Sequence, residues 1–468
     1  MTSKASRREF LKTTSALSIA GSATPWAVNL ASIAAASAQS AAPTDYKALV
    51  CVFMYGGNDH SNTIVPFDAA GYQQYSQSRT NLALAQNTLL SIATPTNASM
   101  AGRQVAMRAE MNSALAGQTG IKGLYDLGRV AVLANVGSLQ VPTTLAQYRA
   151  RSVPLPPSLF SHNDQQTNWQ TSPTSREGTK IGWGGRIGDL FAAFNQYNNF
   201  TCMSASGTAV ILSGTSTVQM QLSGNGAVTI AALNNQTLYG GQNTGTTLRG
   251  LMTADRGHTL EKDYNAINNR TATSAEALNT ALNSANLVTV FPNSGLGNQL
   301  RNVARVIAAR ATLGSRRQVF HVSIGGFDQH SGLVAGHGPL WNTISQAVGS
   351  FNAAMTEVGL QDKVTLFTAS DFGRTLNSNG QGSDHSWGSH HLIVGGAVKG
   401  GDMYGAMPVV VLGGPEDVGR GSLLPSTAVV QYAATLASWF GVSATNLPIV
   451  IPGLSGFSTT DLGFMNAT

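Results

Sequence analysis

Three strongly apolar runs in this sequence each lead, within a few residues, into an aspartate. The runs and their aspartates are 48–55 with Asp59, 319–324 with Asp328, and 364–367 with Asp371. Continuous apolar runs of this length, rich in β-branched residues, are typical of strands covered on both faces, as in a parallel sheet. Parallel strands need crossover connections, usually helices, so the chain is expected to adopt an α/β fold.

Helical patterns alternate with these runs. Apolar residues at helical spacing occupy 300–307, 340–355 and 429–440, and Gly314, Gly359 and Gly441 follow them as expected helix ends. Residues 130–136 and 392–394 predict two further strands of a doubly wound, mostly parallel sheet. Residues 201–251 differ, because short alternating segments lie among Gly, Ser and Asn turns. They predict an antiparallel, β-rich insertion.

The first 38 residues have the features of an export signal. The segment SRREFLK at 6–12 matches the twin-arginine pattern, and a mildly apolar stretch follows it. Small residues at 36–38 offer a cleavage site. We therefore predict a twin-arginine signal over 1–38, the twin-arginine translocase as a partner, and a periplasmic or secreted protein. Residues 39–468 are expected to form one α/β domain.

Composition and charge argue against two classes of protein. No apolar run approaches the roughly 20 residues of a spanning helix, so no transmembrane segment is expected in the mature chain. The net charge of +6 falls to +3 without residues 1–38, and no basic cluster remains, which argues against nucleic-acid binding. Cys51 and Cys202 have no metal-binding spacing. They predict two buried thiols, with a single disulfide as the alternative.

The three aspartates indicate a cation site at one edge of the sheet. Ligands bind beyond the carboxyl ends of parallel strands, so Asp59, Asp328 and Asp371 are expected to lie close together. Histidines accompany two of them, at His60 and His330. Carboxylates and imidazoles that share an edge can hold a divalent cation. For any single aspartate, the alternative is the N-cap of the next helix.

A glycine-rich loop over 382–391 carries three of the nine histidines. His385, His390 and His391 stand directly before the predicted strand at 392–394, which places the loop at an end of the sheet. We expect these three imidazoles to join the cation site. The alternative is an ordinary solvated loop.

A guanidinium and a hydroxyl complete the predicted site. Arg374 is suited to hold a phosphate or sulfate oxyanion, and its alternative is a salt bridge to one of the aspartates. Ser161, at the start of a polar helix, is the candidate nucleophile, with Thr143 or Thr144 as alternatives. The chain has no G-x-S-x-G, G-x-G-x-x-G or G-x-x-x-x-G-K motif. A serine esterase, a Rossmann dehydrogenase and a P-loop NTPase are therefore not expected.

These motifs resemble those of a known family. The chain from about residue 48 to 464 is similar to the exported bacterial proteins of the domain of unknown function 1501 family. That family looks distantly related to sulfatases in the alkaline phosphatase superfamily. The resemblance is carried by YGGND at 55–59, FSHNDQQ at 160–166, GGFDQH at 325–330, SDFGRT at 370–375 and the loop at 382–391.

The resemblance implies an alkaline phosphatase or sulfatase-like fold with one or two divalent metal ions, Zn, Mn or Ca. The ligands that it implies are Asp59, Asp328, His330, Asp371 and a histidine of the set His385, His390 and His391. Two departures stand out. Phe372 occupies the place of a histidine ligand in the relatives, and neither cysteine lies in C-x-P-x-R, so the formylglycine nucleophile of sulfatases is absent.

Two functions are compatible with these features. The first is an exported metal-dependent hydrolase or transferase that acts on a phosphate or sulfate ester, with Ser161 attacking and Arg374 holding the oxyanion. The alternative is a non-catalytic periplasmic protein that binds a glycan or organises the envelope around a degenerate metal site. Phe372 favours the alternative, whereas the histidines of the 382–391 loop and Arg374 favour the enzyme.

Overall fold

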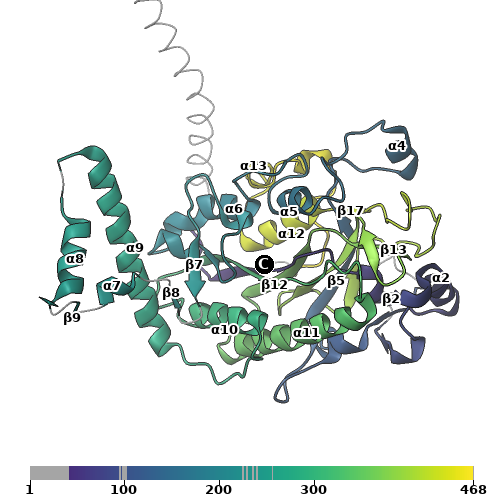
Figure 1. Cartoon of the computed structure of the whole chain (residues 1–468), viewed down its shortest axis with the longest axis horizontal. Coiled ribbons are helices and arrows are strands. Elements are labelled where there is room, and N and C mark those ends of the chain that lie inside the picture. The colour runs from purple at the N-terminus through teal and green to yellow at the C-terminus, as the bar shows by residue number, and fades with distance from the viewer. Residues whose placement is uncertain are drawn as a thin grey trace, which may run out of the picture.

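The body of the protein is built around one large sheet (Figure 1). The computed structural model describes residues 42–93, 96, 103–223, 226–227, 230–234, 237–238, 241–255 and 257–466. The export signal predicted over 1–38 lies outside the described residues. Within the part described, no helix is both long and apolar enough to cross a membrane.

The sheet has ten strands and is mostly parallel. Its order is β16 (Asp402–Tyr404), β5 (Val130–Gly137), β15 (Ser389–Val394), β12 (Val364–Ser370), β1 (Lys47–Met54), β11 (Arg317–Ile324), β6 (Cys202–Ser204), β7 (Met220–Ser223) and β8 (Gly226–Ala227), with β17 (Thr427–Ala428) beside β5. Strand β15 is antiparallel to both β5 and β12, and β8 is antiparallel to β7, while the other pairs are parallel. The predicted α/β fold is confirmed.

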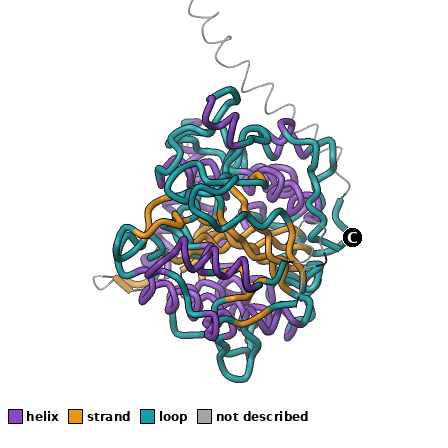
Figure 2. The backbone as a smooth tube through the Cα atoms, turned by 90° about the vertical axis from the view of Figure 1, so that its right-hand side faces the viewer, coloured by secondary structure: helices purple, strands orange, loops and turns teal. Residues whose placement is uncertain are grey.

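Helices cover both faces of the sheet, as a doubly wound fold requires (Figure 2). Alternate residues of β1 point to opposite sides, so that Val50 and Val52 pack in one core and Cys51 and Phe53 in the other. The first core includes α3 (Ile121–Asp126), α10 (Gly295–Ala308) and α11 (Leu333–Glu357), and the second includes α6 (Trp183–Phe191), α12 (Val429–Phe440) and α13 (Leu447–Val450). Cys51 and Cys202 are both buried free thiols, as the sequence predicted.

The segment at 201–251 matches the expected antiparallel insertion only in part, because β7 pairs antiparallel with β8, and β9 (Thr237–Leu238) with β10 (Gly241–Gln242). Strand β6 pairs in parallel with β11, and β7 pairs in parallel with β6, so both extend the main sheet. The edge of a sheet carries backbone N–H and C=O groups without hydrogen-bond partners. These short strands supply partners for the edge groups of β11. The segment ends in α7 (Ala231–Asn234) and α8 (Thr244–Thr253). Helix α8 and the following α9 (Thr259–Ser284) form an antiparallel pair that projects from the body (Figure 1).

Candidate functional site

The loops after β1, β11 and β12 meet at one edge of the sheet. These three strands are parallel neighbours, so their carboxyl ends coincide. The loops are in direct contact, since the Gly56 backbone N–H donates to Asp371 Oδ2 at 3.2 Å. Gly56 has φ +113°, and a Cβ there would lie 2.3 Å from the backbone nitrogen of Asp328. Only glycine fits at this crossing of the two loops.

Three side chains at this edge form a group that could hold a metal ion. His162, Asp328 and His385 each offer one ligand atom, and these atoms lie within 4.8 Å of one another. His385 Nε2 is 3.2 Å from Asp328 Oδ1, and His162 Nε2 is 3.5 Å from Asp328 Oδ2. His162 begins helix α5 (His162–Gln170), and His385 ends strand β14 (Ser383–His385). Asp328 and His385 belong to the predicted set, whereas His162 does not.

The orientation of the two imidazoles favours a cation. His162 Nδ1 lies 2.6 Å from Asp371 Oδ2, and His385 Nδ1 lies 2.7 Å from the carbonyl oxygen of Phe160. Both Nδ1 atoms therefore donate, and each neutral ring carries its lone pair on Nε2. Both Nε2 atoms face the carboxylate of Asp328, which is itself an acceptor. Of the three acceptors, His162 Nε2 is buried without a hydrogen-bond partner among the described residues. A bound cation would satisfy it together with the other two, and ligating histidines are commonly oriented in this way.

The charges of the group are set by its neighbours. The hydrogen bond to Asp371 raises the pKa of His162. Burial lowers the pKa of His385, which keeps that ring neutral at pH 7. Burial acts to raise the pKa of Asp328, but the hydrogen bond and charge of Arg374 outweigh it and lower the pKa. Asp328 is therefore ionised, and a proton on His162 competes with a metal ion.

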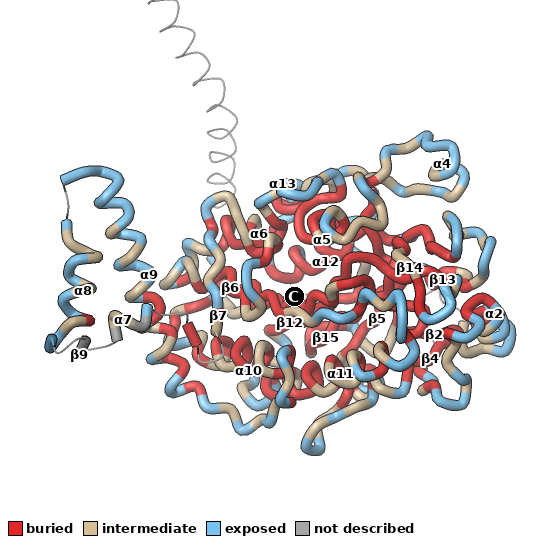
Figure 3. The backbone as a smooth tube through the Cα atoms, in the orientation of Figure 1, coloured by how far each residue is buried: buried red, intermediate tan, exposed pale blue. Residues whose placement is uncertain are grey.

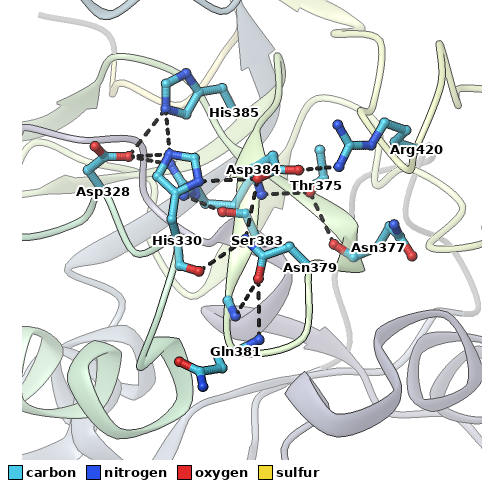
Figure 4. Close-up of polar contacts among 12 residues, drawn as sticks. Asp328, His330, Thr375, Asn377, Asn379, Gln381, Ser383, Asp384, His385 and Arg420 are labelled. Carbon is cyan, nitrogen blue, oxygen red and sulfur yellow. Dashed lines mark hydrogen bonds and ion pairs between the residues drawn. The ribbon is translucent and has the colours of Figure 1, made fainter.

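His330 lies beside this group and links it to a second acidic residue (Figure 4). His330 Nε2 is 3.0 Å from both Asp328 Oδ1 and His385 Nε2. His330 Nδ1 is 3.1 Å from Asp384 Oδ1, and the other oxygen of Asp384 pairs with Arg420. His330 is half exposed, and the guanidinium of Arg420 is largely exposed. Asp384 and Arg420 were not among the site residues predicted from the sequence.

A cavity of about 480 Å³ opens beside these residues. It is lined by Tyr148, Phe160, His330, Thr375, Asp384, His385, Val418, Gly419, Arg420 and Ser422. A neighbouring cavity of about 500 Å³ shares Tyr148 and Phe160 and adds Arg149 and Arg151. Phe160 has φ +73°, a conformation that non-glycine residues adopt at a cost, and its carbonyl is the one that fixes His385.

Arg374 has the second of its two predicted roles. It is fully buried, and its Nη1 donates to Asp328 Oδ1 at 2.9 Å and to the carbonyl oxygen of Gly56 at 3.2 Å. Its Nη2 donates to the carbonyl oxygen of Ser383. Arg374 therefore forms a salt bridge with an aspartate. The exposed guanidinium of this site belongs to Arg420.

Asp59 has its own counter-ion. Its Oδ2 pairs with Nη2 of Arg79, the last residue of α2 (Ala69–Arg79), and both side chains are buried. Arg79 Nη1 also donates to the carbonyl oxygen of Thr375 at 2.8 Å. Burial raises the pKa of Asp59 despite the charge of Arg79. The arginine thus occupies one oxygen of the carboxylate that was predicted to bind a metal ion.

Three other predicted ligands are not members of the group of three. Oδ2 of Asp371 accepts a hydrogen bond from Nδ1 of His162 and so orients that ring. His390 and His391 lie within β15, where both are buried. Nδ1 of His390 accepts from the backbone N–H of Asn135 at 3.0 Å, and the ring of His391 packs at a tilt against Trp169. Because successive side chains of a strand alternate, both rings enter the interior on opposite faces of the sheet.

The candidate nucleophiles are placed differently from one another. Ser161 is the N-cap residue of α5, but its hydroxyl makes no capping hydrogen bond. It lies in sequence between Phe160 and His162, which both contact the site. Thr144 caps α4 (Leu145–Ala150), and Thr143 Oγ1 donates to the carbonyl oxygen of Val141 at 2.9 Å.

Phe372 packs beside both imidazoles, whose own ring centroids are 4.3 Å apart. Its ring centroid is 4.9 Å from that of His162 and 4.6 Å from that of His385. The phenylalanine therefore forms an apolar wall behind the group, and two histidines from other segments lie against it. His162 could have been found in the sequence, because it belongs to the polar motif at 160–166 that also contains Ser161.

A family model described as "Protein of unknown function (DUF1501)" matches residues 46–420. No curated protein matches the chain. The solved structure of Ps i-CgsB in complex with k-i-k-neocarrahexaose is similar at 8% identity and a TM-score of 0.36, covering 88% of this chain and 75% of that one. The PsFucS1 sulfatase from Pseudoalteromonas sp. is similar at 10% identity and a TM-score of 0.28, covering 94% and 76%.

Proposed function

Since this chain belongs to the DUF1501 family, whose description names no reaction, we propose from its site that it is an exported metal-dependent hydrolase or transferase acting on a phosphate or sulfate ester. One observation carries the proposal. His162 and His385 both direct Nε2 at the carboxylate of Asp328 while their Nδ1 atoms are held by other acceptors. Three convergent acceptors beside an open cavity fit a divalent cation and its ligand.

The site fits one cation per chain. His162, Asp328 and His385 would hold it, and Asp371 would orient His162. The counter-ion at Asp59 argues against a second ion at that carboxylate. A divalent cation bound by the three residues would polarise the ester and stabilise developing negative charge.

The remaining residues have assignable tasks. Arg420, largely exposed at the cavity, binds the anionic group of the substrate. Ser161 Oγ attacks phosphorus or sulfur, and its proton passes to solvent. The bond to the ester oxygen breaks, and that oxygen takes a proton from His330 Nε2, whose Nδ1 is held by Asp384. Water then releases the group from Ser161 in hydrolysis, or an alcohol accepts it in transfer.

Mature protein purified without chelator is expected to contain about one divalent cation per chain, because three oriented acceptors converge on one point. Elemental analysis by mass spectrometry measures this. Asp328→Ala and His385→Ala should lose the ion, and Asp371→Asn should weaken its binding by about 10- to 100-fold by releasing His162.

Two exposed residues outside the site serve as matched controls. His258→Ala and Asp126→Ala remove the same kinds of side chain and should leave the metal content unchanged. Wild-type protein that binds none of Zn, Mn, Ca and Mg would contradict both the metal site and the mechanism.

Two buried arginines favour the alternative function, that of a non-catalytic binding protein. Arg79 and Arg374 neutralise carboxylates that a richer metal site would use. A protein that only binds a glycan or organises the envelope needs a binding cavity but does not need to catalyse a reaction. A panel of aryl phosphates and sulfates decides between the two functions, because the binding protein would cleave none of them when loaded with metal.

Export is proposed from the twin-arginine motif. Replacing Arg7 and Arg8 with lysine is expected to leave the precursor in the cytoplasm, because the translocase recognises paired guanidinium groups and not charge alone. Immunoblotting of periplasmic and cytoplasmic fractions measures the outcome. Unchanged export of the double variant would show that the motif is accidental.

A further inference from the structure

Helix α9 carries a mostly apolar stripe along its length, in which Thr271 and Ser274 are the polar members. Residues spaced alternately by four and three lie on one face of the helix, as in a coiled coil. They are Leu260, Tyr264, Ile267, Thr271, Ser274, Leu278, Ala281 and, at the C-cap, Ala285.

Only half of this stripe is covered. Ser274, Leu278 and Ala281 are buried where α9 meets the body. Leu260, Tyr264 and Ile267 are 72%, 64% and 51% exposed, because the first half of the helix extends beyond the body (Figure 3). The same pattern that docks the second half therefore continues into solvent.

Helix α8 does not cover the exposed half, because it packs on the opposite face of α9. Arg249 of α8 pairs with Glu276 and donates to Thr273 Oγ1 at 3.3 Å. The amide of Asn265 donates to the carbonyl oxygen of Ala254. At 100° per residue these α9 positions lie about 140° to 220° around the helix from Leu260, far from the stripe.

We propose that the exposed half of the α9 stripe binds the same stripe of a second copy of this chain, with the two helices antiparallel. A two-fold axis between residues 265 and 266 places Tyr264 against the partner's Ile267 and Leu260 against the partner's Thr271. The interface is then self-complementary, as a two-fold dimer requires. Tyrosine and aliphatic side chains from both copies cover one another.

The charged residues beside the stripe favour a second copy of this chain as the partner, and they favour an antiparallel pair of helices. Asp263 and Arg270 flank the stripe on one side, both are exposed, and neither has an ion-pair partner among the described residues. In the antiparallel pair, Asp263 faces the partner's Arg270, and the contact occurs twice. A parallel pair would place Asp263 opposite the partner's Asn268 and leave both charges unmatched.

Sedimentation equilibrium of the mature full-length chain from 1 to 100 μM tests the dimer. Ile267→Glu places a charge in the stripe and is expected to weaken association by about ten-fold or more. Ala266→Glu adds the same charge on an exposed neighbouring position outside the stripe and should leave association unchanged. A wild-type chain that stays monomeric over this range would overturn the proposal.

Charge reversal provides a test that misfolding cannot imitate. Asp263→Arg and Arg270→Asp should each weaken self-association, because like charges then face each other twice. The double variant should restore the dimer, and an equimolar mixture of the two single variants should form a heterodimer. Failure of both the double variant and the mixture would overturn the antiparallel arrangement. A monomeric wild type that sediments with lipid vesicles through Ile267 would assign the stripe to a membrane surface instead.

Discussion

Replacing Ser161 with alanine is expected to lower turnover of an aryl phosphate or aryl sulfate by about a thousand-fold or more, while metal content and melting temperature stay near those of the wild type. The hydroxyl forms the bond to the transferred group, but the cation is held by His162, Asp328 and His385. Asp328→Asn should lose metal and turnover together, because it removes the only carboxylate of that group. Initial rates, elemental analysis and thermal melts of the same preparations separate the two effects.

Thr143→Ala and Thr144→Ala are the matched hydroxyl controls. Thr144 caps α4 and Thr143 bonds within its own turn, so their loss should leave turnover within about two-fold of the wild type. Full activity of Ser161→Ala would show that the nucleophile is one of these threonines or water. No cleavage of any ester by metal-loaded wild type would favour the binding protein.

Acid is expected to destabilise this protein steeply below about pH 6. Burial lowers the pKa of His321 to about 4 and those of His390 and His391 to about 3, against about 6.5 in the unfolded chain. Burial also holds the pKa values of His60 and His337 well below the ordinary value. The unfolded state therefore binds more protons, and stability present above pH 6.5 is lost as the pH falls toward the folded values.

The expected loss is large compared with ordinary stability. Each such histidine contributes a slope of about 1.4 kcal/mol per pH unit, against a total of roughly 5 to 15 kcal/mol for a folded domain. Urea unfolding at a series of pH values between 7.5 and 4.5 measures the slope. His321→Gln should reduce it by one histidine's share. His258→Gln, at an exposed position, should not alter it, and an unchanged slope in His321→Gln would contradict the explanation.

The strands that carry the site were accessible from the sequence because they are continuous apolar runs. The runs before Asp59, Asp328 and Asp371 became β1, β11 and β12, and their parallel pairing brings the loops that follow to one edge. The apolar pattern of each run was sufficient to predict these strands, because a strand that is buried on both faces is apolar along its own length.

The partners of the charged side chains were not accessible in the same way. Arg79 reaches Asp59 from a helix whose position depends on long-range packing, and no local pattern marks it. His390 and His391 were expected in a loop because the strand was predicted to begin at residue 392, whereas β15 begins at Ser389. An error of three residues at that boundary moved two imidazoles from the loop into the interior of the sheet.

The pairing of Asp59 with Arg79 has a consequence for the order of events during maturation. Like the ligand Asp328, which pairs with Arg374, Asp59 has its permanent positive partner within the chain itself, so charge balance at this edge of the sheet requires no ion. Chelation should therefore empty the site without unfolding the domain, and the apoprotein should take up metal again from solution. Folding and metal loading are thereby separable steps, and loading can take place on either side of the membrane that the folded protein is proposed to cross.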